Sequence, residues 1–281
     1  MSAVTASATL PSRRLGLRSQ ALNPLATLAR RRFQLTARTP RELLVPLLTP
    51  VMFALVIAPA LKSALHTNAS YESFVAIGTV GLLIPLNTMF AGIGVIVDRE
   101  NGAQRELLTA PIPRALLVFG NLVVALAITG LQVGVLIAVA VARRIHFSPT
   151  ASGVGWFVAS ATLFAIGMYA VAEILANRVP KQEEYIARLP AIAIVPWFLA
   201  GSLFPITALP VVLTWIAKFL PLTHALALMR YGLLGDSTSL HTIWGMSNPT
   251  EMAGLSLAVT AAFAVVLTAV SIRVFTRSSL R

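Results

Sequence analysis

Six long apolar stretches, separated by polar gaps, dominate the sequence. Each is close to the ~20 residues that an α-helix needs to cross the ~30 Å hydrocarbon core of a bilayer. The stretches cover residues 43–61, 73–97, 115–142, 154–176, 189–207 and 253–272. This pattern predicts an all-α integral membrane protein with six transmembrane helices. The prolines at positions 46, 50 and 59 should kink or partly break the first helix.

A seventh candidate, residues 209–229, is less apolar than the other six. Lys218 lies at its centre, and a central lysine costs roughly 2.5–3.5 kcal/mol on insertion into a membrane. Pro221 interrupts the same stretch. We therefore expect two short amphipathic helices broken at Pro221. They would form a re-entrant pair, within residues 208–235, that enters the membrane from outside without crossing it.

The first 41 residues differ in character from the rest. Residues 1–20 are rich in Ser, Thr, Ala and Arg, and they are expected to form a disordered cytoplasmic tail. Residues 21–41 mix leucines with arginines, as an amphipathic helix lying in the membrane interface would. A solvated basic linker is the alternative for this segment. Residues 42–281 would then form the six-span domain.

Composition supports the membrane assignment. The chain is 57% hydrophobic and 11% charged, whereas soluble domains are about 25% charged. The surplus apolar surface must therefore face lipid. The net charge of +12 could suggest a nucleic-acid partner, but the basic residues lie in the gaps between apolar stretches, so no nucleic acid is expected. The absence of cysteine excludes disulfides and thiolate metal sites.

The basic residues also predict the orientation. Of the 22 Lys and Arg residues, 17 fall in the terminal segments and alternate gaps that lie inside if the N-terminus is cytoplasmic, and five fall outside. Cytoplasmic segments carry the excess of Lys and Arg in membrane proteins. Both termini should therefore be cytoplasmic.

The richest polar segment is the inner gap at residues 98–114. Three acids and three arginines alternate there in an otherwise charge-poor chain. Gly102 can turn the chain, and residues 104–109 can form a short helix that Pro111 and Pro113 end. Such a segment could dock a partner through Leu107 and Leu108, with charges around them. An ordinary solvated loop is the alternative.

A second segment leaves the fifth stretch on the outer side. It contains Phe204-Pro205, then Pro221 and His224, and ends at Arg230. Aromatic and basic groups of this kind suit the lipid head-group layer. The alternative is an interfacial belt without a role in handling a substrate.

Together the two segments resemble the type-2 ABC exporter permease family, the membrane subunits of bacterial drug, polyketide, glycolipid and polysaccharide exporters. The resemblance lies in an Asp-Arg-Glu-x-Gly-x-x-Arg-Glu-Leu-Leu-x-x-Pro-x-x-Arg run at 98–114, with Gly120 shortly after it. It also lies in a Phe-Pro…Leu-Pro-Leu-Thr-His…Arg run at 204–230, which looks especially like the daunorubicin-resistance and nodulation-factor exporter permeases.

The resemblance implies that ATP binding and transport are carried out by separate subunits. A separate ATP-binding cassette subunit would contact the N-terminal interfacial helix and the loop after the second span, which is the coupling helix in that family. The coupling positions carried over to this chain are Glu100, Arg105, Glu106, Leu107 and Leu108. The exit-side positions in the re-entrant segment are Phe204, Pro205, Pro221, His224 and Arg230.

The resemblance also implies a cytoplasmic membrane of a bacterium, alternating access, and a dimer with a second copy or a sister permease. The substrate would be amphiphilic, such as a drug, polyketide, glycolipid or lipid-linked glycan. No phosphate-loop motif occurs in the sequence, so ATP and Mg should bind the partner, with no cofactor and no catalytic residues on this chain. The four scattered histidines predict no metal site.

An ion-gradient-driven secondary transporter is the alternative from another class. Such proteins usually carry several buried ionisable groups near the middle of the membrane. Here only Glu173 is a candidate, about one turn from the inner end of the fourth span. We expect it to reach water or Arg178 and to anchor the helix at the interface.

Overall fold

The computed structural model describes residues 17–37, 44, 47–48, 51–57, 59–60, 63, 69–109 and 113–278. In this part of the chain every regular element is helical. The elements are α1 (Leu17–Ala37), a short π-helical turn η1 (Phe53–Ile57), α4 (Ala69–Glu100), α5 (Ala103–Thr109), α6 (Arg114–Ala142), α7 (Ala151–Ala176), α8 (Gln182–Leu199), a 3-10 turn η2 (Ile206–Ala208), α9 (Val211–Phe219), α10 (Pro221–Leu234), α11 (Thr238–Trp244) and α12 (Pro249–Ser278).

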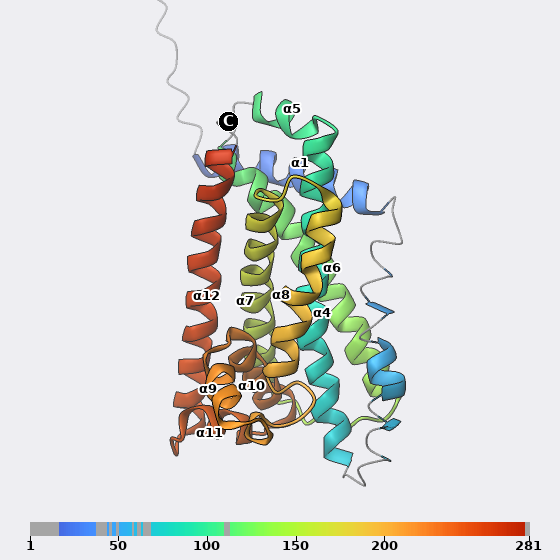
Figure 1. Ribbon diagram of the computed structural model, residues 1–281, viewed down its shortest axis with the longest axis vertical. Coiled ribbons are helices and arrows are strands. Elements are labelled where there is room, and N and C mark those ends of the chain that lie inside the picture. Colours follow the sequence, from blue (N-terminus) through green and yellow to red (C-terminus); the bar gives the residue numbers. More distant parts are fainter. Residues whose placement is uncertain are drawn as a thin grey trace, which may run out of the picture.

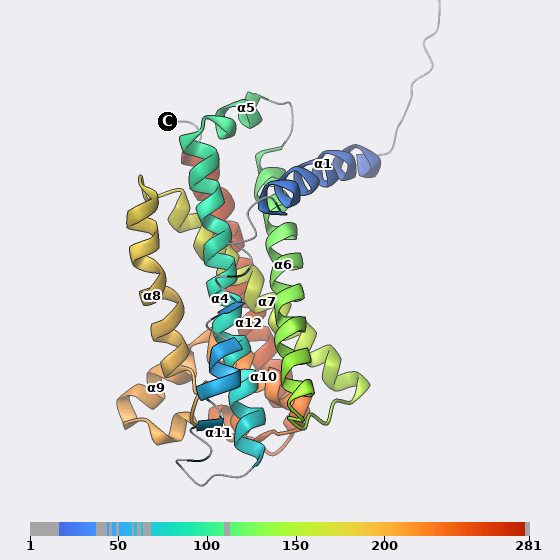
Figure 2. The ribbon, with the colours of Figure 1, turned by 90° about the vertical axis from the view of Figure 1, so that its right-hand side faces the viewer.

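The long helices run side by side and form an elongated bundle (Figures 1 and 2). Helices α1 and α5 lie at one end, with α1 crosswise to the bundle, and α9, α10 and α11 lie at the other. Four described helices, α4, α6, α7 and α12, are long and apolar enough to cross a membrane. Large apolar side chains on their outer faces are exposed, including Leu131 at 67% and Val265 at 67%. Such a surface suits lipid, so this is a multi-pass membrane protein.

These four helices contain four of the six predicted spans, 73–97, 115–142, 154–176 and 253–272. The first predicted span, 43–61, lies largely outside the described residues. The expected tail, 1–20, lies outside them up to residue 16, and residues 17–20 already belong to α1.

The fifth predicted span, 189–207, has different bounds in the structure. Helix α8 begins at Gln182 and ends at Leu199, before the apolar stretch is over. Gly201 has a φ of +78°, a left-handed conformation that ends a helix and that glycine adopts without a steric cost. The remaining apolar residues form an irregular segment in which Ala200, Ser202 and Ile206 are buried. Hydropathy alone does not distinguish such a buried segment from the end of a helix.

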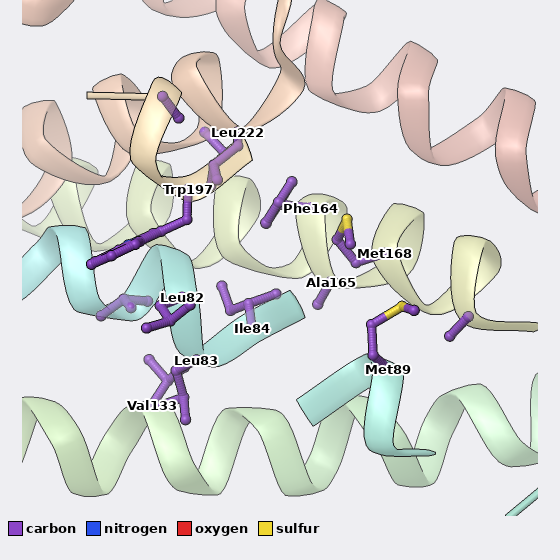
Figure 3. Packing of buried hydrophobic residues seen from close by; sticks show 14 of the residues in the cluster. Leu82, Leu83, Ile84, Met89, Val133, Phe164, Ala165, Met168, Trp197 and Leu222 are labelled. Carbon is purple, nitrogen blue, oxygen red and sulfur yellow. The ribbon is translucent and has the colours of Figure 1, made fainter. Parts of the chain in front are cut away.

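The core lies where α4, α6, α7, α8 and α10 meet. Figure 3 shows Leu83 of α4 beside Val133 of α6, and Phe164 and Met168 projecting from α7. Trp197 of α8 is 1% exposed, and its indole Nε1 donates a hydrogen bond of 2.7 Å to the carbonyl of Gly78. An indole N–H usually finds such a partner when it is buried. This bond joins α8 to α4.

Helices α9 and α10 are separated by a sharp bend, as the proline at 221 predicts. The two helices together are as apolar as a span, but they meet at an angle of 79°. Pro221 occupies the first turn of α10, where its missing N–H leaves no hydrogen bond broken. Because of the bend, α9, α10 and α11 pack together at the end of the bundle opposite α5, and this region is called the cap.

Candidate functional site

Helix α5 continues from α4 through a single tight turn. Gly102 has a φ of +77°, a left-handed conformation that changes the direction of the chain between the two helices. The seven residues of α5 then run from Ala103 to Thr109, and the hydroxyl of Thr109 donates to the Glu106 carbonyl over 2.7 Å. The short helix predicted at 104–109 is therefore present. It lies at the end of the bundle beside α1 (Figure 2).

The predicted coupling positions face in different directions. Glu100 and Glu106 are exposed, so their carboxylates are available to a partner. Leu107 is half-buried and packs against a cluster that contains Leu117 of α6 and Phe275 of α12. The side chains of Arg105 and Leu108 lie outside the described residues. On α5, charge therefore faces outward, while Leu107 anchors the helix to its own bundle.

Asp98, in the last turn of α4, binds α1. Its carboxylate accepts from Arg31 Nη2 at 3.5 Å and from Arg32 Nη1 at 3.3 Å. Arg32 Nη2 also donates to the Ala91 carbonyl over 3.2 Å. Opposite charges on two helices, one of them crosswise to the other, hold α1 against the end of α4 that leads into α5.

Gly120 permits the close approach of α1 to α6. A β-carbon at position 120 would lie 2.9 Å from Cβ of Leu28, which is too close for two carbon atoms. The glycine that follows the charged run in the sequence is therefore explained by the packing of α1.

Arg99 binds the opposite side of the same helix end. Its Nη1 donates to the Ala176 carbonyl at 2.7 Å, and its Nη2 donates to the carbonyls of Val179 at 2.7 Å and Pro180 at 3.1 Å. The last carbonyls of a helix have no partner within the helix, and a cation near them is favourable. Helix α7 has no basic residue in its last turn, so Arg99 supplies the missing donor from α4.

Neither Asp98 nor Arg99 is among the coupling positions predicted from the sequence, and neither residue was assigned a contact within the chain. Asp98 and Arg99 bind within the chain, whereas Glu100 and Glu106 do not face the bundle. The lack of a basic residue at the end of α7 was the signal that a donor had to come from another helix.

The expectation that Glu173 reaches water or Arg178 is wrong. Glu173 is 1% exposed, and it accepts from Tyr169 Oη at 2.9 Å and from Asn177 Nδ2 at 3.2 Å. Residues four apart lie one above the other on a helix, so the carboxylate is satisfied by its own helix on both sides. The spacing of the three residues in the sequence was the available signal.

At the other end of the bundle, Arg230 is buried, with 2% of its surface exposed. Its Nη2 donates to the carbonyls of Gly201 at 2.8 Å and Ser202 at 3.2 Å, in the segment after α8. The guanidinium carbon lies 3.4 Å from the ring centre of Phe74, on α4. A cation over an aromatic face is attracted by the ring quadrupole. Arg230 thus links α10 to α4 and to the end of α8.

His224 is a second buried residue of α10 that links neighbouring helices. One ring nitrogen, Nε2, lies 2.9 Å from the Lys218 carbonyl of α9, and the other, Nδ1, lies 3.3 Å from Oγ of Ser256 on α12. The indole N–H of Trp244 donates to the same Ser256 hydroxyl over 2.8 Å. These bonds join α9, α10, α11 and α12 into one unit.

The other exit-side positions are at the surface or at a helix start. Phe204 is 36% exposed, and Pro221 begins α10. Pro205 lines a cavity together with Arg230. The structure therefore brings Pro205 and Arg230 together, and it places all the exit-side positions at the end of the bundle opposite the coupling positions (Figure 1).

Comparison with known proteins identifies similar sequences. Residues 24–234 match the family described as ABC-2 type transporter. A protein of Porphyra purpurea named "Putative transport permease ycf38" is 25% identical over 215 residues, which is 75% of this chain and 74% of the relative. The family match begins inside α1 and ends with the last residue of α10, so it contains both groups of predicted site residues.

Proposed function

The chain belongs to the ABC-2 type transporter family, and on that premise we propose that it is the permease subunit of an ATP-driven exporter. The observation that supports the proposal best is the position of α5. It is a short helix with one exposed acidic side chain, Glu106, at the end of a membrane-capable helix whose last turn is held by Asp98 and Arg99. A helix in this position can contact a subunit that binds ATP and transmit its movement to α4.

The proposed topology has six spans and two cytoplasmic termini, in the cytoplasmic membrane of a bacterium. Residues 43–61 and helix α8 supply the two spans beyond the four long helices. Helix α1 lies in the inner interface, where the exposed Arg30 faces the lipid head groups while Arg31 and Arg32 bind Asp98. Helices α9 and α10 form the outer re-entrant pair, which the 79° bend between them favours over a straight span.

Two permeases, either two copies of this chain or this chain and a sister permease, enclose the transport path. The six helices of one chain are too few to enclose a transport path alone. Alternating access also requires that the inward-open and outward-open packings of the helices be similar in energy. Two ATP-binding cassette subunits dock at α5 and carry the ATP and Mg. The substrate is amphiphilic, such as a drug, polyketide, glycolipid or lipid-linked glycan, which matches the apolar surface of the long helices.

The test is a charge reversal on α5. Glu106→Lys places a cation where an exposed acid faces the partner, and an unpaired charge at an interface typically costs about 2–5 kcal/mol. We expect less ATP-binding subunit to co-purify and export to fall, at membrane levels equal to the parent. Asn101→Ser, an exposed change beside the same turn, is the matched control and should leave both measurements unchanged. Equal export and equal co-purification for Glu106→Lys would show that α5 is a solvated linker.

A further inference from the structure

A cavity of about 180 Å³ lies at the end of the bundle opposite α5. Its lining includes Phe74 of α4, Thr223 and Arg230 of α10, and Thr238 of α11. A neighbouring cavity of about 500 Å³ shares Phe74, Pro205 and Asp236 with it. Together they form a hollow between α4, α10, α11 and the segment after α8, with a cation in its wall.

The cation is incompletely neutralised. All three hydrogen bonds of Arg230 to described residues come from Nη2, and its buried Nε has no partner. Within the described part of the chain no carboxylate forms an ion pair with it. Its observed counterparts are carbonyl dipoles, the ring of Phe74 and the charge of Asp236, which lines the same cavity without pairing directly with it. A buried charge is costly unless it is both paired and hydrogen-bonded, and the unpartnered Nε leaves a donor that an anion from outside the chain could use.

A second donor lies on the same helix face. Thr223 is 4% exposed, lines the cavity, and its Oγ1 has no hydrogen-bond partner among the described residues. Positions 223 and 230 are two helical turns apart, so both project from one side of α10. A buried hydroxyl normally has a partner, and a ligand oxygen would provide one.

The far side of the cavity carries hydroxyl groups and one acid. Thr238, Ser239 and Thr242 line it, and Asp236 accepts from the backbone N–H of Thr238 at 2.8 Å. Asp236 repels an anion, so its charge sets the affinity in the direction opposite to Arg230. Removing either charge should therefore change anion affinity in opposite directions, which is not expected if Arg230 only holds the fold together.

The surroundings suit a lipid head group. Trp215, Tyr231 and Trp244 belong to the same end of the bundle, and tryptophan and tyrosine concentrate at the level of the head groups. Trp215 is 60% exposed, and Lys218 lies 5.3 Å from its ring centre. The cavity is therefore at the depth where phosphate groups of a bilayer lie.

We propose that this cavity binds a phosphate group, with the guanidinium of Arg230 and the hydroxyl of Thr223 as donors. The group is either the head-group phosphate of a membrane lipid or free phosphate. The site concerns binding at one end of the bundle, and it does not depend on whether the chain works as an exporter.

Binding is measured on the purified full-length chain in detergent, by native mass spectrometry and by thermal unfolding. The probes are dioctanoyl phosphatidylglycerol, dioctanoylglycerol, which has the same chains without a phosphate, and inorganic phosphate. We expect phosphatidylglycerol to bind and to raise the unfolding temperature, and dioctanoylglycerol to do neither. Binding of inorganic phosphate with the same mutational pattern would identify the free anion as the source. Equal binding of the two dioctanoyl probes, with none of phosphate, would overturn the proposal.

Two substitutions shift the affinity in opposite directions. Thr223→Val removes the hydroxyl and should weaken phosphatidylglycerol binding about tenfold, the value of a hydrogen bond to a charged group. Thr223→Ser keeps the hydroxyl and is the matched control. Asp236→Asn removes the repelling charge, keeps an oxygen for the Thr238 N–H, and should strengthen binding. If Thr223→Val and Asp236→Asn both bind like the parent, Arg230 is only a structural clamp. No transport is measured, so this failure would leave the proposed function untouched.

Discussion

Two arginines at the α5 end, Arg31 and Arg32, are bound differently from Arg230 at the other end of the bundle. At the α5 end, Arg31 and Arg32 share the carboxylate of Asp98, and their side chains are 38% and 12% exposed. At the other end, Arg230 is 2% exposed and binds backbone carbonyls and the ring of Phe74. The first arrangement pairs opposite charges that are partly buried, since Asp98 is 16% exposed. The second buries a single charge within the cap of the bundle.

The difference shows what each end can do. Exposed ion pairs are typically worth about 0–1 kcal/mol, and the pairs of Asp98 with Arg31 and Arg32 are partly buried but have matched charges. Removing one partner of a buried charge costs much more, typically 3–5 kcal/mol. The ion pairs that hold α1 should therefore be less costly to break than the contacts of Arg230, while Arg99 at the α5 end binds backbone carbonyls as Arg230 does.

The largest expected effect concerns the sides of the membrane on which the two ends lie. The chain contains no cysteine, so single cysteines can be introduced at Gln104 in α5 and Thr238 in α11. An impermeant thiol reagent added to intact cells should label Thr238→Cys and miss Gln104→Cys, because the excess of basic residues predicts that α5 is inside.

After the cells are opened, both positions should react, which serves as the control for accessibility. Labelling of Gln104→Cys in intact cells would place the two ends on the same side, and the comparison would no longer describe an inner and an outer end.

The second effect is the stability of the cap. Arg230→Leu leaves the carbonyls of Gly201 and Ser202 without their donor and should lower the free energy of unfolding by roughly 3 kcal/mol. Thermal unfolding of the purified chain in detergent measures the change. Arg230→Lys keeps the charge but loses the planar guanidinium. Its unfolding temperature should therefore lie between those of Arg230→Leu and the parent. An unchanged unfolding temperature for Arg230→Leu would contradict the burial argument.

The smallest effect is expected at the α5 end. Asp98→Asn removes the charge shared by Arg31 and Arg32, and the cost should be about 1 kcal/mol, decreasing at high salt. A double-mutant cycle with Arg32→Gln isolates the pair. A salt-independent loss as large as that of Arg230→Leu would remove the distinction between the two ends.

Local signals in the sequence predicted much of the fold. Long apolar stretches predicted α4, α6, α7 and α12, Gly102 predicted the turn before α5, and Pro221 predicted the break between α9 and α10. Each of these depends on residues that are neighbours in the chain, where hydropathy and backbone restrictions act directly.

The contacts of the site could not be predicted in the same way. Arg230 and Gly201 are 29 positions apart, and Arg99 and Ala176 are 77 apart. Their pairing depends on how the helices pack, which single-sequence patterns do not specify. The end of α8 at Leu199 was missed for the same reason, since the chain after it is held by the contacts of Arg230 with the carbonyls of Gly201 and Ser202.

The three carbonyl bonds of Arg99 have a mechanical consequence. Because they join the last turn of α4 to the connection between α7 and α8, that turn cannot rotate alone. Either the connection moves with it, or all three bonds break. A displacement of α5, which follows α4 after one turn, is therefore passed to the start of α8 as a rigid movement. In this way a force applied at one short helix reaches two chain segments that are distant in sequence.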